Sequence, residues 1–163
     1  MTAVEIDKEM IALARKYMDL DHLKVSVVQQ DAFEFISSES SEVDVIIDDL
    51  YHARGDDVER PEGVTPTYLD TLRDHLCPWG SLVMNFVVGP GHDTVFQEAC
   101  SAFKSCFQQS RRIIPPNSHN EALVGSNHPA ALATPSRLLD IADRFTSEQD
   151  RGHWKELRTL KLR

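Results

Sequence analysis

The stretch TAVEIDKEMIALARKYM, residues 2–18, decides the fold of this chain. Its first part is apolar until it ends in carboxylates, which is typical of a buried strand. In its second part apolar residues recur at the i, i+3, i+4 and i+7 spacing of one helix face, at Met10, Leu13, Ala14 and Tyr17. Asp7, between the two parts, is a suitable helix N-cap. The stretch therefore predicts a strand that leads directly into a helix.

The rest of the chain continues this alternation of strands and helices. Apolar, β-branched runs predict a mostly parallel sheet at residues 3–6, 25–28, 43–47 and 82–87. Amphipathic segments predict helices from Thr65 onward and over 93–107, and a last helical segment from 135 through Trp154. Residues 111–114 and 122–125 predict an antiparallel hairpin, and residues 49–65 predict a polar loop. The pattern indicates an α/β fold with a Rossmann-like sheet.

Length and composition limit the class of protein. With 163 residues, 41% of them hydrophobic, the chain is expected to form a single domain over 1–163. We find neither a signal peptide nor the roughly 18 consecutive apolar residues of a membrane span, so a cytoplasmic protein without membrane contact is expected. Three cysteines without CxxC spacing indicate neither a disulfide framework nor a zinc site, and we predict no metal.

The net charge of −9 argues against binding to nucleic acid, because neutralising phosphates takes a surplus of Lys and Arg. A small cationic substrate or a basic protein segment is the expected partner, and a homo-oligomer is a further expectation. Four acids of the loop after the third strand run could attract such a cation, although acidic runs are more often solvated surface: Asp56, Asp57, Glu59 and Glu62.

Acidic residues follow each of the first three predicted strands. Glu5 and Asp7 end the first strand, Asp31 follows the second, and Asp48 and Asp49 end the third. Ligands of open α/β sheets bind beyond the carboxyl ends of the strands, and a carboxylate there can accept hydrogen bonds from both hydroxyls of a ribose. Acids at these positions are also ordinary helix caps. Their repetition in register favours a nucleoside-binding edge.

Three segments carry a family resemblance: AVEIDKEMIALARKYM, VSVVQQDAFEFI and EVDVIIDDLY. In this order and at these distances they resemble class I S-adenosylmethionine-dependent methyltransferases, in the branch that includes the spermidine synthases of polyamine biosynthesis. The resemblance covers about residues 2–88. The segments NEALVGSNHPA and TPSRLLDIADRF also resemble spermidine-synthase-like methyltransferases that modify elongation factors.

The resemblance implies roles for individual residues. Glu5, with Ile6, would hold the ribose of S-adenosylmethionine or its decarboxylated form, and Asp31 with Ala32 would hold the adenine. Asp49 would face the amino-acid or sulfonium end of that cofactor and is a candidate catalytic residue. Tyr51 is either a packing residue or a platform for the substrate.

The sequence departs from the family pattern at two places. The family has a strand and a G-x-G-x-G turn before the segment that corresponds to AVEID, whereas all seven glycines here lie downstream of it, the first at Gly55. We therefore expect that the first strand of the family is missing, and that the chain as given binds cofactor weakly or not at all.

The second departure concerns the catalytic loop. Spermidine synthases have an aspartate base three residues after the one that corresponds to Asp49, and here that position is His52. A neutral imidazole can act as a base near pH 7, but it gives no fixed negative charge for a polyammonium substrate.

Three functions follow as hypotheses. The preferred one is transfer of a methyl group, which asks little acid–base chemistry of the protein. The first alternative is an aminopropyltransferase with His52 as base. The second is a non-catalytic remnant that serves as an interaction subunit through exposed strand edges.

Overall fold

The computed structural model describes residues 1–61, 63–128 and 134–162. Glu62 and the residues at 129 and 130 of the NEALVGSNHPA segment lie outside these ranges. The chain divides into two compact units, Met1–Ser41 and Glu42–Arg163, and each is described by itself. The single domain over 1–163 stays a prediction.

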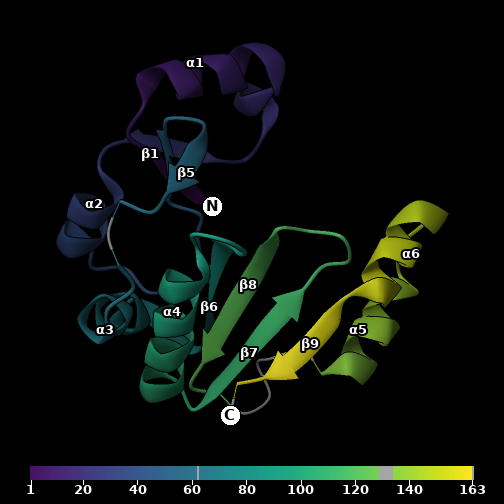
Figure 1. Cartoon of the computed structure of the whole chain (residues 1–163). Helices are drawn as coiled ribbons and strands as arrows, with labels where there is room; N and C mark the ends of the chain where they lie inside the picture. Colours follow the sequence, from purple (N-terminus) through teal and green to yellow (C-terminus); the bar gives the residue numbers. More distant parts are fainter. Residues whose placement is uncertain (62, 129–133, 163) are drawn as a thin grey trace. The chain divides into compact units, whose positions relative to one another are not determined.

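The first unit is a small β-α-β arrangement (Figure 1). Two strands pair in parallel, with Glu5 in register with Gln29: β1 (Thr2–Glu5) and β2 (Ser26–Gln29). They alternate with helical segments, namely α1 (Lys8–Tyr17), the 3₁₀ turn η1 (Leu20–His22) and α2 (Ala32–Ser38). Asp7 caps α1 by accepting a hydrogen bond from the Glu9 amide at 2.7 Å, because the first N–H groups of a helix have no partner within it. The strand-to-helix prediction from residues 2–18 is confirmed.

The second unit contains a five-stranded sheet in the order β3-β6-β8-β7-β9 (Figure 1). Its strands are β3 (Val43–Asp48), β6 (Leu76–Val87), β7 (Gln109–Ile114), β8 (Asn120–Ser126) and β9 (Arg158–Lys161). β3 and β6 run parallel, whereas β8, β7 and β9 join by antiparallel pairing. The predicted α/β class and the predicted hairpin are confirmed, and the sheet has both parallel and antiparallel strands.

The helices of this unit are α3 (Pro66–Asp74), α4 (Asp93–Cys106), α5 (Pro135–Ala142) and α6 (Glu148–Glu156). Of these, α3 and α4 pack against the sheet, and α5 and α6 pack against each other. α3 begins as predicted, with Thr65 as N-cap and Pro66 in the first turn. Leu69 of α3 and Phe103 of α4 are fully buried, as are Leu82 and Leu123 of the sheet. None of the helices in the described ranges is long and apolar enough to span a bilayer.

Three sequence predictions about the fold need correction. The four predicted parallel runs do not form one sheet, because β1 and β2 pair only with each other in the described part of the chain. The predicted polar loop contains a hairpin, β4 (His52–Arg54) and β5 (Asp57–Glu59), whose turn is made possible by Gly55 at φ +61°. The predicted last helical segment is two helices, and the strand β9 after it was not predicted.

Candidate functional site

Glu5 and Asp31 lie together at one edge of the first unit. They follow the carboxyl ends of the paired strands β1 and β2, and the Gln30 amide donates to the Glu5 carbonyl at 3.2 Å. Glu5 Oε1 accepts from the Asp7 amide, and Asp31 Oδ1 caps α2 by accepting from the amides of Phe33 and Glu34. Among the described residues the second oxygen of each carboxylate has no hydrogen-bond donor. Each of these carboxylates thus has one oxygen that could accept a hydrogen bond from a ligand.

Two further predicted cofactor residues belong to the same unit. Ile6 follows β1 directly and its side chain is 63% exposed, while Ala32 is the first residue of α2 and is half-buried. Their role toward a cofactor stays a prediction.

Asp49 lies in the second unit, directly after β3. Its Oδ1 accepts a hydrogen bond from Asn85 Nδ2 of β6 at 2.9 Å. Because β3 and β6 are parallel and in register at Asp48 and Met84, both side chains stand at the carboxyl edge of this strand pair.

Tyr51 is held at the same edge by two hydrogen bonds. Its phenolic oxygen accepts from the Val87 amide at 3.0 Å, and the hydroxyl donates to the Asn85 carbonyl at 3.3 Å. Burial raises the pKa of the Tyr51 phenol above its ordinary value of 10.0. Tyr51 is therefore a neutral, fixed side chain at physiological pH.

His52, the first residue of β4, is engaged within the β4–β5 hairpin. Its Nε2 lies 3.2 Å from Oε1 of Glu59, and Oε2 of the same carboxylate pairs with Arg54. Arg54 and, to a smaller extent, His52 lower the pKa of Glu59 below its ordinary value. Both oxygens of this carboxylate are thus taken by neighbours on the hairpin.

A buried ion pair lies where β3 ends. Nη2 of Arg60 is 2.9 Å from each oxygen of Asp48, and the two side chains are 4% and 3% exposed. The hydroxyl of Tyr68 and the amide of Leu50 also donate to this carboxylate, at 2.9 and 3.2 Å. A buried carboxylate needs such partners, because burying a charge without them is costly.

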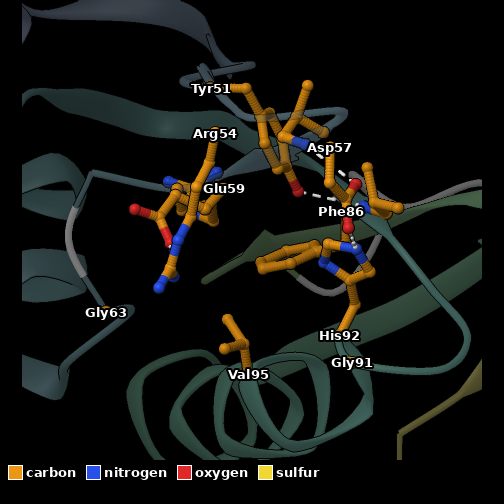
Figure 2. Close-up of a pocket in the computed structure, with 12 residues that line it drawn as sticks. Tyr51, Arg54, Asp57, Glu59, Gly63, Phe86, Gly91, His92 and Val95 are labelled. Atoms are coloured by element: carbon orange, nitrogen blue, oxygen red, sulfur yellow. Dashed lines mark hydrogen bonds and ion pairs between the residues drawn. The ribbon is translucent and has the colours of Figure 1, made fainter.

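A cavity of about 430 Å³ opens beside this pair. Apolar and aromatic side chains form part of its wall: Tyr51, Val58, Phe86, Val87 and Val95. Polar and ionisable side chains form another part, namely Arg54, Asp57, Glu59, Arg60 and His92, and Gly63 and Gly91 complete the lining. Figure 2 shows Arg54 and Glu59 on one side of the hollow and the ion pair of His92 with Asp57 on the other.

The structure brings only one of the three predicted catalytic residues to this cavity. Tyr51 lines it, whereas Asp49 and His52 are not among its lining residues in the described part of the chain. Sequence reasoning missed Arg60, Phe86 and His92. One signal was available for Arg60: an aspartate that ends an apolar strand, as Asp48 does, is often buried and then needs a cationic partner.

The cavity lies where ligands of open α/β sheets bind, at the carboxyl ends of parallel strands. The family model described as the spermine/spermidine synthase domain matches residues 1–114. The chain belongs to this family. No curated protein sequence is significantly similar to it.

Solved structures agree with this family at the level of the fold. The chain is similar to a probable spermidine synthase from Corynebacterium glutamicum (TM-score 0.70, 19% identity, covering 99% of this chain and 57% of that one). It is also similar to human methyltransferase-like protein 13 in complex with SAH (TM-score 0.69, 19% identity, 94% and 70% covered). Spermidine synthase from Thermotoga maritima gives a TM-score of 0.61 at 18% identity, with 90% and 50% covered. The chain thus spans little more than half the length of the two synthases.

Other features of the described residues add no metal centre to this site. No group of three or more His, Cys, Asp or Glu in the described ranges is arranged to hold a metal ion. Cys77, Cys100 and Cys106 are free thiols.

Proposed function

We propose that this spermidine-synthase-family chain takes part in the transfer of a methyl group from S-adenosylmethionine. The observation that supports methyl over aminopropyl transfer is the state of His52. It stands where the resemblance places a catalytic aspartate, and it is hydrogen-bonded to Glu59 on an exposed hairpin. A hydrogen-bonded imidazole can still act as a base, but His52 does not line the cavity in the described part of the chain, which supports methyl transfer over proton abstraction from an amine bound there.

Two observations support the proposed cofactor: the carboxylate acceptors of the first unit and the ligands of similar solved structures. Glu5 and Asp31 place two carboxylate acceptors at one strand edge, which fits an adenosine. One similar structure was solved with SAH and another, a spermidine synthase, with the transition-state analogue AdoDATO. When bound, S-adenosylmethionine supplies an electrophilic carbon next to its sulfonium, so the protein contributes mainly positioning and exclusion of water.

Product analysis separates the candidate functions. The chain is incubated with decarboxylated S-adenosylmethionine and putrescine, and formation of methylthioadenosine is followed by mass spectrometry. We expect none, together with saturable, weak binding of labelled S-adenosylmethionine that S-adenosylhomocysteine displaces. Methylthioadenosine would establish the aminopropyltransferase alternative instead. If neither cofactor shows saturable binding, both enzymatic candidates are excluded and the interaction subunit is the remaining candidate function.

One observation favours that interaction subunit as the second candidate. β3 stands at one end of the order of the five-stranded sheet, and its side chains Val45 and Ile47 are 53% and 71% exposed. An exposed apolar edge strand is a template for pairing with another chain. The partner of this candidate is another subunit, and a second copy of this chain is the partner that can be tested directly.

A further inference from the structure

Arg60 carries hydrogen-bond donors that nothing in the described part of the chain accepts. Nη2 serves both oxygens of Asp48, whereas Nε and Nη1 are buried without an acceptor. A guanidinium has five N–H groups, so three of them remain unpaired. Buried polar groups in native proteins nearly always have a partner, and each exception needs an explanation.

The immediate surroundings of this guanidinium are aromatic. Cζ of Arg60 lies 5.6 Å from the ring centre of Tyr51 and 5.3 Å from that of Phe86. Ring faces stabilise a cation, and Arg60 lies close enough to the Tyr51 hydroxyl to lower the pKa of that phenol, but neither Nε nor Nη1 has an acceptor in hydrogen-bond geometry among the described residues. Arg60 also lines the cavity of about 430 Å³, so a ligand there is the available source of an acceptor.

The carboxylates of the cavity wall are already fully engaged. Asp57 accepts from the Val58 amide with Oδ1 and pairs with His92 through Oδ2. Glu59 pairs with His52 through Oε1 and with Arg54 through Oε2. Each oxygen of these wall carboxylates thus has a partner, whereas Arg60 has buried donors with none in the described part of the chain, which favours an anionic ligand over a polyammonium one.

We propose that this cavity binds a carboxylate carried on a small aromatic or apolar body, with Arg60 as the residue that holds the carboxylate. The inference deepens the proposed function, on which it rests, by naming the class of acceptor substrate. Arginine suits this task because N–H groups of a guanidinium make short, charge-assisted hydrogen bonds to carboxylates. Phe86 and Val95 provide the apolar surface for the body of the ligand. Both free nitrogens are covered in the structure, so the carboxylate reaches them only after neighbouring side chains shift.

Two probes of equal size and opposite charge test the proposal. Benzoate and benzylamine, which is protonated at pH 7, are titrated separately into the 163-residue chain without cofactor, and binding is followed by two-dimensional NMR. We expect benzoate to bind about tenfold or more tightly than benzylamine, with shifts at Tyr51 and Phe86. Equal affinity, preference for benzylamine, or binding of neither probe would overturn the proposal.

Substitutions then locate the binding group. Arg60→Lys keeps a cation beside Asp48 but removes the fork of donors, and it should weaken benzoate binding about fivefold or more. Arg112→Lys is the matched control, because Arg112 also pairs with a carboxylate, that of Glu121, but does not line the cavity. It should leave benzoate affinity unchanged. Wild-type affinity in a folded Arg60→Lys variant would contradict the role of Arg60.

A second variant tests the role of Arg60 in carboxylate binding even if Arg60→Lys does not fold. Asp48→Asn removes the charge that neutralises Arg60, so benzoate should bind more tightly, by about threefold or more. Unchanged or weaker binding in folded Asp48→Asn would overturn the proposal. Because no cofactor is present, these results do not depend on the outcome of the S-adenosylmethionine titration that tests the proposed function.

Discussion

One nitrogen of Arg60 holds both oxygens of Asp48, at 2.9 Å each, in a pair from which solvent is almost excluded. The pair joins the end of the edge strand β3 to the segment after the β4–β5 hairpin. It thereby fixes the loop that carries Tyr51 at the edge of the cavity, and it leaves the other nitrogens of Arg60 without acceptors in the described ranges.

Breaking this pair should strongly destabilise the fold. Arg60→Met leaves the Asp48 carboxylate buried without its counter-ion, and we expect a loss of about 3–5 kcal/mol in the free energy of unfolding. Urea denaturation followed by circular dichroism measures it. Arg54→Met, which removes the cation of an exposed pair, is the control and should cost much less. Equal losses in both variants would show that burial does not set the strength of the Arg60 pair.

Two glycines should respond oppositely to alanine. At Gly125 a Cβ would lie 2.4 Å from Cδ2 of Phe107, so Gly125→Ala should destabilise the protein by about 1–3 kcal/mol. At Gly152, inside α6, a Cβ meets nothing within 4 Å, and Gly152→Ala should stabilise α6 by up to about 1 kcal/mol. Thermal unfolding of both variants provides the measurement. Stabilisation by Gly125→Ala would contradict the close packing there, and destabilisation by Gly152→Ala would contradict the open space at that position.

Acid should weaken the β4–β5 hairpin. The Val58 amide and, after it, His92 lower the pKa of Asp57, while Arg54 and then His52 lower that of Glu59. A carboxyl group with a lowered pKa in the folded state stabilises the fold above its unfolded-state pKa, and this contribution is lost as the pH falls through the folded-state value. Below the ordinary values of 3.8 and 4.5, stability should therefore fall.

The contribution of Glu59 to this acid sensitivity can be isolated. Urea midpoints of the wild type and of Glu59→Gln are compared at neutral pH and below pH 4.5, the ordinary pKa of that group. We expect the wild type to lose more stability on acidification than the variant, because glutamine does not titrate. Parallel losses would mean that Glu59 is not a source of the pH dependence.

The chain should bind S-adenosylmethionine more weakly than micromolar. Two carboxylate contacts, each worth about 1.5–3 kcal/mol, do not by themselves offset the roughly 4–15 kcal/mol cost of capturing a ligand over most of that range. Within this weak binding, Glu5→Ala should reduce affinity about tenfold. Asp31→Asn keeps an oxygen acceptor for the cap of α2 and tests the ligand role of Asp31 without removing that cap. Calorimetry that finds tight binding by the 163-residue chain would refute this account of its binding edge.

Self-association should depend on the exposed edge strand. If two copies pair through β3, Ile47→Lys should shift the protein toward monomer in sedimentation velocity, since lysine on an edge strand opposes pairing. Val95→Lys, at a side chain that is 39% exposed on α4, is the control for a new surface charge. A wild type that is monomeric throughout the accessible concentration range would rule out self-association through β3.

Local patterns in the sequence predicted most secondary structure. The apolar runs became β1, β2, β3 and β6, and the caps Asp7 and Thr65 begin helices as expected. Such features depend on residues a few positions apart, so they are readable from order and spacing. The three strand-end motifs also predicted the family that the model match over residues 1–114 shows.

The arrangement of the cavity was decided only by the tertiary structure. Arg60, Phe86 and His92 come from separate segments, and no local spacing relates them. The hairpin of β4 and β5 was hidden among charged residues, which carry no period-2 apolar signal. β9 was missed because its four residues, Arg158–Lys161, include one apolar side chain, Leu160, and because its pairing with β7 is a contact distant in sequence.

The sequence by itself thus determined the strand-to-helix units and the acids at the strand ends, because hydrophobic spacing and capping act over a few residues. Only the tertiary structure decided which charges neutralise one another. The acidic run suggested that Asp57 and Glu59 attract cationic ligands. In the structure Asp57 pairs with His92 and Glu59 pairs with Arg54. Pairing and burial, rather than net charge, decide which groups remain available to a ligand. In the described part of this chain the available groups are Nε and Nη1 of Arg60.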